Sequence, residues 1–146
     1  MIRGPFSCKM AYMTTDINDI AKRAFETNEK NGYNEYRQEL EENGKKAAVK
    51  HLGNKGLITV SEETEAQDEL RAGHEPYEIY FGDDMKPEGY LVEKVDTVIR
   101  VLGDISEVFD VHADELEGWD IAKLIKLKQD YNDRRKDTAT SGHKAF

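Results

Sequence analysis

Apolar residues recur at helical spacing in the first part of the chain. They follow Thr14-Thr15-Asp16, whose side-chain oxygens can cap a helix, and we expect that helix to end at Asn31-Gly32. A weaker helix is expected from about Tyr33 to Glu42. The basic, glycine-punctuated stretch 45–56 is compatible with helix, loop or both. The apolar stripe of the first helix consists of Ile17, Ile20, Ala21, Ala24 and Phe25.

Three further helices are predicted in the rest of the chain. One is expected from about Leu57 to Ala72, and a last one from about Trp119 to Arg135. The strongest pattern runs from about Tyr90 to Phe109, where apolar residues recur at spacings of four and three. Such a seam is typical of helices packed in an antiparallel bundle. Its members are Leu91, Val95, Val98, Leu102, Ile105 and Phe109.

The segment between the two longest patterns reads as a connection. Residues 74–89 contain two prolines and several turn-forming residues, and Tyr77 to Phe81 predicts either a short strand or an aromatic clamp. The patterns together predict an all-α fold, an antiparallel helical bundle of about four to five helices, completed by homo-oligomerisation. We assign the helical domain to 14–136, a loosely held arm to 1–13 and a polar tail to 137–146.

Composition restricts the partners and the compartment. Only 38% of residues are hydrophobic and 35% are charged, so few apolar side chains are available to form a core within one chain. This favours association with another copy. The net charge of −9 argues against binding a nucleic-acid polymer. The single cysteine, Cys8, allows no internal disulfide, and we see neither a signal peptide nor a membrane span, so we expect a cytoplasmic protein. His51, His74 and His112 lack metal-ligand spacing and are expected at the surface.

Two acidic runs suggest a metal site. Glu62 and Glu65 are three residues apart, as are Glu93 and Asp96, so each pair shares one face of a helix. One such pair alone is more often a solvated helical face. If the two helices pack together, however, four carboxylates converge, and a cation would relieve their repulsion. Oxygen ligands without Cys or His favour Mg²⁺, or Mn²⁺, over Zn²⁺.

The order of these motifs resembles a known family. The pairs Glu62-x-x-Glu65 and Glu93-x-x-Asp96 are followed by Lys128-x-x-Tyr131-Asn132-x-x-Arg135 and by Gly142-His143-Lys144, and they are preceded by Asn28-Glu29-Lys30-Asn31-Gly32-Tyr33. In this sequence of segments the chain resembles the MazG-like, all-α nucleoside triphosphate pyrophosphohydrolases, especially the short single-domain forms of phages and bacteria. Ser61 stands where that family often has a further acid.

The resemblance implies a function and roles for these residues. It implies Mg²⁺-dependent hydrolysis of a nucleoside triphosphate, (d)NTP, to (d)NMP and pyrophosphate by a homodimer or homotetramer, in the host cytoplasm if the gene is a phage gene. The metal would be held by Glu62, Glu65, Glu93 and Asp96, of which Glu62 and Glu65 would also be catalytic, and the water's proton would pass to an acid such as Glu63 or Asp68. Phosphate and nucleoside would contact Lys128, Tyr131, Asn132, Arg135, Asn28 and Lys144.

Two other functions remain open at the level of sequence. The chain is also compatible with a non-catalytic interaction module whose apolar seam binds a partner's amphipathic helix. It is compatible as well with a homologue that binds nucleotide but has weakened activity. Release of pyrophosphate from a triphosphate distinguishes these readings from the enzyme.

Overall fold

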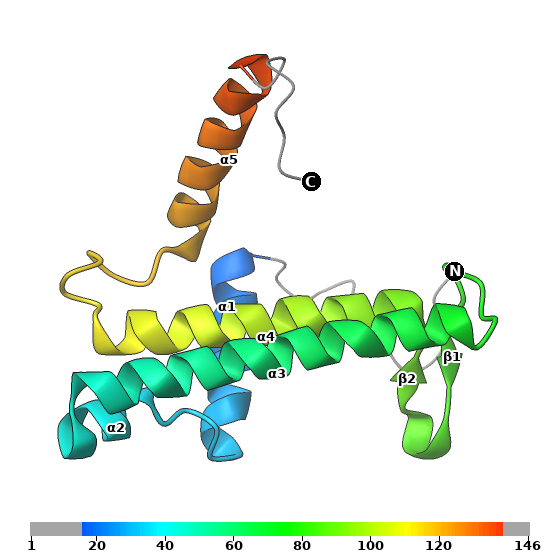
Figure 1. Ribbon diagram of the computed structural model, residues 1–146, viewed down its shortest axis with the longest axis horizontal. Helices are drawn as coiled ribbons and strands as arrows, with labels where there is room; N and C mark the ends of the chain where they lie inside the picture. Colours follow the sequence, from blue (N-terminus) through cyan, green and yellow to red (C-terminus); the bar gives the residue numbers. More distant parts are fainter. Residues whose placement is uncertain (1–15, 139–146) are drawn as a thin grey trace.

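Five α-helices and a small hairpin make up the part of the chain that the computed structural model describes, residues 16–138 (Figure 1). The helices are α1 (Ile17–Lys30), α2 (Tyr36–Asn43), α3 (Lys45–Arg71), α4 (Tyr90–Val111) and α5 (Ile121–Thr138). The prediction of an all-α fold is confirmed. The expected arm at 1–13 and most of the expected tail at 137–146 lie outside the described residues. Within 16–138, no helix is both long and apolar enough to cross a bilayer.

The long helices α3 and α4 lie side by side and antiparallel, and they form the body of the molecule (Figure 1). Helix α3 is continuous over 27 residues and begins at Lys45 rather than at about Leu57. Gly53 and Gly56 do not interrupt it, although each costs about 1 kcal/mol in a helix. Packing of α3 against α4 and α2 offsets that cost, so the stretch that sequence left open is helical.

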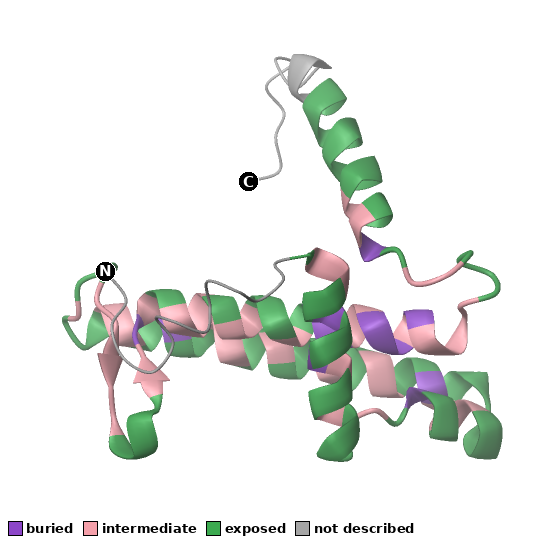
Figure 2. Ribbon diagram, turned by 180° about the vertical axis from the view of Figure 1, so that it is seen from behind, coloured by how far each residue is buried: buried purple, intermediate pink, exposed green. Residues whose placement is uncertain are grey.

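The apolar core lies where α1 crosses α4. Ala21, Leu102, Phe109 and Ile121 are buried there, and Ile17, Ile105, Trp119 and Ile125 pack around them. In Figure 2, the buried residues of α4 are concentrated near this crossing. Asn18 joins the two ends of the domain, because its side chain donates to Asp120 Oδ1 at 3.2 Å and accepts from the backbone N–H of Ala122 at 3.1 Å. The start of α5 is thus tied to α1.

The predicted seam of α4 is buried over only part of its length. Leu102 and Phe109 are 5% and 4% exposed, whereas Leu91, Val95 and Val98 are 44–55% exposed. The reason is that α1 covers only the later turns of α4, and α3 contacts a different stripe of the helix. The first half of the seam is therefore uncovered in the single chain, and Leu57 and Val60 of α3 are also exposed.

A hairpin connects α3 to α4. Strands β1 (Tyr80–Phe81) and β2 (Pro87–Glu88) pair antiparallel, with Tyr80 opposite Glu88, across a 3₁₀ turn at Asp83–Met85. The hydroxyl of Tyr80 donates to both carboxylate oxygens of Glu69 at 2.7 and 2.9 Å, and its ring stacks on His74. This contact fixes the hairpin against the end of α3. The strand alternative for 77–81 is the correct one, shortened to two residues.

Candidate metal centre and adjoining cavity

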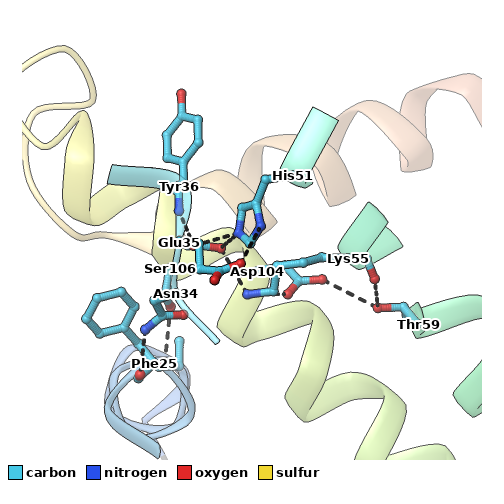
Figure 3. A network of polar contacts seen from close by, with 11 residues as sticks. Phe25, Asn34, Glu35, Tyr36, His51, Lys55, Thr59, Asp104 and Ser106 are labelled. Atoms are coloured by element: carbon cyan, nitrogen blue, oxygen red, sulfur yellow. Dashed lines mark hydrogen bonds and ion pairs between the residues drawn. The ribbon is translucent and has the colours of Figure 1, made fainter. Parts of the chain in front are cut away.

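Polar side chains, rather than apolar ones, fill much of the interface between α3 and α4. At the end near α2, the buried carboxylate of Glu107 accepts from Lys55 Nζ at 2.9 Å, His51 Nε2 at 3.0 Å and the backbone N–H of Tyr36 at 2.8 Å. Lys55 also pairs with Asp104 Oδ1 at 3.2 Å, and Figure 3 labels these four partner residues. Every buried charge here has a partner, as burial requires. These contacts fix the register of α3 against α4.

One expectation about histidine is wrong at this network. The side chain of His51 is only 11% exposed, because it lies between α3 and α4 against Glu107. His112 is half-buried and its Nε2 is 2.7 Å from the hydroxyl of Tyr36. His51 is thus part of the α3–α4 interface, and His112, at the end of α4, joins that helix to Tyr36 of α2.

Towards the hairpin, carboxylates gather in the same interface without an equal number of cations. Oxygens of Glu62, Glu93 and Asp96 all lie within 4.8 Å of one another. The neighbouring carboxyl group of Glu65 raises the pKa of both Glu62 and Glu93, by its charge and by hydrogen bonding when a proton is shared. Helix periodicity explains this meeting, since each pair lies three residues apart on one face and the two faces oppose each other. The four acids that the sequence singled out therefore lie together.

The electrostatics of the cluster are those of crowded anions. Burial first, and then the hydrogen bond and charge of Glu65 and the charge of Asp96, together raise the pKa of Glu93 to about 7. Burial is also the main cause that raises the pKa of Glu62; Arg100 opposes it, and Glu65 and Asp96 reinforce it. A site of this kind takes up either protons or a cation.

Two basic side chains act on the cluster. Arg100 places Nη2 at 3.2 Å from Glu62 Oε1, and its Nε is 3.8 Å from Asp96 Oδ2. Lys86, from the hairpin, lowers the pKa of Glu93 electrostatically, although burial and the acids outweigh it. The two further acids considered as proton acceptors point elsewhere: Glu63 pairs with Lys94, and Asp68 pairs with Arg71.

A cavity of about 650 Å³ is lined by Arg100, which contacts the cluster at Glu62, whereas the cluster carboxylates themselves do not line it. Asn28, Ile58 and Asp104 are among its lining residues, and so are His51 and Lys55 of the Glu107 network. Arg100 belongs to both places, since it lines the cavity and contacts Glu62. The volume falls within the range of sites for small organic ligands, roughly 300–1,000 Å³. Asn28, which the resemblance places near the nucleotide, lines the same cavity as Arg100, and Arg100 contacts the acidic cluster.

The remaining predicted substrate residues lie on α5. Lys128, Tyr131, Asn132 and Arg135 are exposed, and Lys128 Nζ lies 5.0 Å from the ring centroid of Tyr131. Helix α5 contacts α1 near its start and then extends away from the α3–α4 pair (Figures 1 and 2). The single chain therefore does not bring these side chains to the carboxylates. Lys144 lies outside the described residues.

Arg100 stands four residues after Asp96, and this spacing alone predicts only a local ion pair between the two side chains. A signal for a larger role was present, because Glu93, Asp96, Arg100, Asp104 and Glu107 recur at spacings of three and four along α4. A charged stripe with helical period on the most apolar helix of the chain indicates a polar face turned towards another helix.

Comparison of the chain with protein-family models, with curated proteins and with solved structures found no match. The residues and distances above, with the order of motifs in the sequence, therefore carry the functional argument.

Proposed function

We propose that the protein is a Mg²⁺-dependent nucleoside triphosphate pyrophosphohydrolase that converts a (d)NTP to (d)NMP and pyrophosphate. The observation that carries the proposal is the carboxylate cluster of Glu62, Glu93 and Asp96 beside a cavity of nucleoside size. The cluster suits a metal–phosphate group and the cavity suits the rest of a nucleotide. The order of motifs in the sequence supports the same reaction.

The donor set fits a hard divalent cation. Three carboxylates with oxygens within 4.8 Å of one another, with the carboxyl group of Glu65 acting on the pKa of two of them, offer only oxygen ligands. Mg²⁺ is commonly held by a few carboxylates together with water and substrate phosphates, and Mn²⁺ accepts the same ligands. When bound, the ion would lower the pKa of a water and offset charge on the phosphoryl oxygens.

Residues of the chain would accept the proton of the attacking water and bind the nucleoside. Water attacks the α-phosphorus, the bond from that atom to the oxygen bridging to the β-phosphorus breaks, and pyrophosphate leaves with that oxygen. Glu65, the exposed member of the group, accepts the proton of the water. Glu63 and Asp68 are less suited, because both pair with cations away from the cluster. Asn28 and Ile58 contact the nucleoside in the cavity.

We also propose that two or more copies associate. Leu91, Val95 and Val98 continue the stripe that α1 covers further along α4, yet they are 44–55% exposed in one chain. Helix α5 likewise exposes Leu127 and Tyr131. A second copy packed on α4 would bury these groups, and an α5 from another chain would offer Lys128 and Arg135 to the phosphates. Light scattering of the wild type, compared with Val95→Glu, tests the association.

The test of function is a screen for pyrophosphate release from canonical (d)NTPs, with and without Mg²⁺. We expect metal-dependent release from at least one of them, and its loss in Glu65→Gln and in Asp96→Asn while the helical circular dichroism is retained. Glu26→Gln, which changes an exposed acid of α1, serves as the matched control. Full activity in both cluster variants would refute the metal assignment.

One observation favours a different function, an interaction module. The exposed aliphatic side chains of α3 and α4 would also suit the amphipathic helix of another protein. An intact protein that hydrolyses no triphosphate in the screen, and whose helices bind such a peptide, would favour this second candidate. A protein that binds nucleotide without hydrolysing it would instead be a homologue with weakened activity.

A further inference from the structure

Arg100 lies at the boundary between the carboxylate cluster and the cavity. Its guanidinium contacts Glu62 Oε1 at 3.2 Å, and its side chain lines the cavity together with Asn28 and Ile58. A ligand with one end at the cluster and the other in the cavity must therefore pass this side chain. Sequence motifs did not assign Arg100 to any ligand.

The hydrogen-bonding capacity of Arg100 is only partly used. Its Nε is buried and has no hydrogen-bond partner among the described residues, because Asp96 Oδ2, at 3.8 Å, is beyond hydrogen-bond range. Lys55 differs, since the structure pairs it closely with both Asp104 and Glu107. A guanidinium carries five donors in a planar fork that matches phosphate oxygens. Arg100 thus has a donor that its neighbours leave unsatisfied, and movement of the side chain away from Glu62 would make that donor accessible to an anion in the cavity.

Arg100 and a bound metal ion would compete for the carboxylate of Glu62. A divalent cation held by Glu62, Glu93 and Asp96 would repel the guanidinium and would compete with it for Glu62. A phosphate bound to that cation offers Arg100 another partner. We propose that Arg100 is a phosphate-binding residue that leaves Glu62 for the phosphates when a divalent metal binds. This inference rests on the proposed function and adds to it a ligand-binding role for Arg100, to which the motifs give none.

The proposal requires opposite effects on two ligands, measured by calorimetry on the full chain at a pH above about 7, where Glu93 is mostly ionised. Arg100→Gln should bind Mn²⁺ alone more tightly, by roughly tenfold, because a repelling charge is gone. It should bind inorganic tripolyphosphate, in saturating Mn²⁺, about 10- to 100-fold more weakly, because charge-assisted hydrogen bonds are lost.

Two variants control the experiment. Arg100→Lys keeps the charge but loses the fork, so Mn²⁺ binding should stay within about twofold of the wild type while tripolyphosphate binding weakens. It also provides a second variant if Arg100→Gln does not fold. Arg71→Gln removes an arginine that pairs with Asp68 elsewhere on α3, and neither affinity should change.

Each other result has a distinct meaning. Weaker binding of both ligands by a folded Arg100→Gln would overturn the proposal, because Arg100 would then hold Glu62 in position for the metal. Tighter Mn²⁺ binding with unchanged tripolyphosphate binding would also overturn it, leaving Arg100 as a counter-charge only. Failure of the wild type to bind Mn²⁺ would overturn the proposed function as well. The first two results, in contrast, overturn only the role of Arg100.

Discussion

Replacing Glu93 by glutamine should stabilise the metal-free protein above about pH 7 and leave its stability unchanged below pH 4.5. Burial, followed by the contacts with Glu65 and Asp96, raises the pKa of Glu93 from 4.5 to about 7. The folded state thus holds this proton more tightly than the unfolded state. The stabilising contribution is complete below pH 4.5 and is lost as the pH rises through about 7.

The size of the effect follows from the two pKa values. At about 1.4 kcal/mol per pH unit, the interval from 4.5 to about 7 gives an upper bound of roughly 3.5 kcal/mol. Glu93 is only half-buried and water screens part of the repulsion, so we expect about 1–2 kcal/mol. Glutamine removes this cost because it is neutral and has nearly the same shape. Mg²⁺ removes the same cost in the wild type by neutralising the carboxylates, and should stabilise Glu93→Gln less.

The assay is urea denaturation followed by circular dichroism at one protein concentration, on both sides of the interval. Wild type and Glu93→Gln are compared in chelator and then in Mg²⁺, with Glu26→Gln as the control. The reasoning would be refuted if Glu93→Gln were no more stable than the wild type above pH 7. An equal gain in Glu26→Gln would refute it as well, because the effect would then reflect net charge rather than the cluster.

Three further predictions concern the scaffold and use the same denaturation assay. Gly89→Ala should destabilise by at least about 2 kcal/mol, because Gly89 has a φ of 135° and an added Cβ would lie 2.2 Å from the carbonyl oxygen of Glu78; normal stability would contradict this placement of the hairpin. Gly53→Ala and Gly56→Ala should each stabilise by about 0.5–1 kcal/mol, since nothing lies within 4 Å of the added Cβ; a loss of stability would mean that another chain packs closely there. Glu107→Gln should cost about 2–4 kcal/mol because Lys55 loses its most buried counter-charge and one of the two acceptor oxygens that serve Lys55, His51 and the Tyr36 N–H is replaced by a donor, and a cost below about 0.5 kcal/mol, typical of surface changes, would argue against the network.

Local pattern was sufficient for much of this fold and for part of the candidate site. The start of α4 at Tyr90 and of α1 beside Asp16 follows from helical spacing and capping, which are properties of neighbouring residues. The acid pairs are visible for the same reason. Whether the two acid pairs face each other depends on the register of α3 against α4. The spacing of residues within either helix does not determine that register.

The features that sequence missed all depend on contacts between distant residues. The side chain of His51 is only 11% exposed because it contacts Glu107, 56 positions later. Helix α3 runs through Gly53 because α4 and α2 pack against it, whereas its local sequence is compatible with a loop. Spacing along α4 predicts the ion pair of Arg100 with Asp96, but the contact of Arg100 with Glu62 forms only because α3 and α4 pack against each other. The direction of α5 is a further case, since periodicity predicts its length and not its orientation.

The unequal distribution of charge along the α3–α4 interface suggests how the chain combines stability with a binding site. Near α2, Lys55 lies between Asp104 and Glu107, and these pairs hold the two helices in one register. That same register brings Glu62 opposite Glu93 and Asp96, where the acids outnumber the cations. A merely solvated surface would let such side chains turn apart, whereas here burial raises the pKa of two of them. The ion pairs near α2 therefore keep the carboxylates near the hairpin close together in spite of their repulsion. A divalent cation that binds to these carboxylates would recover the free energy that the repulsion costs.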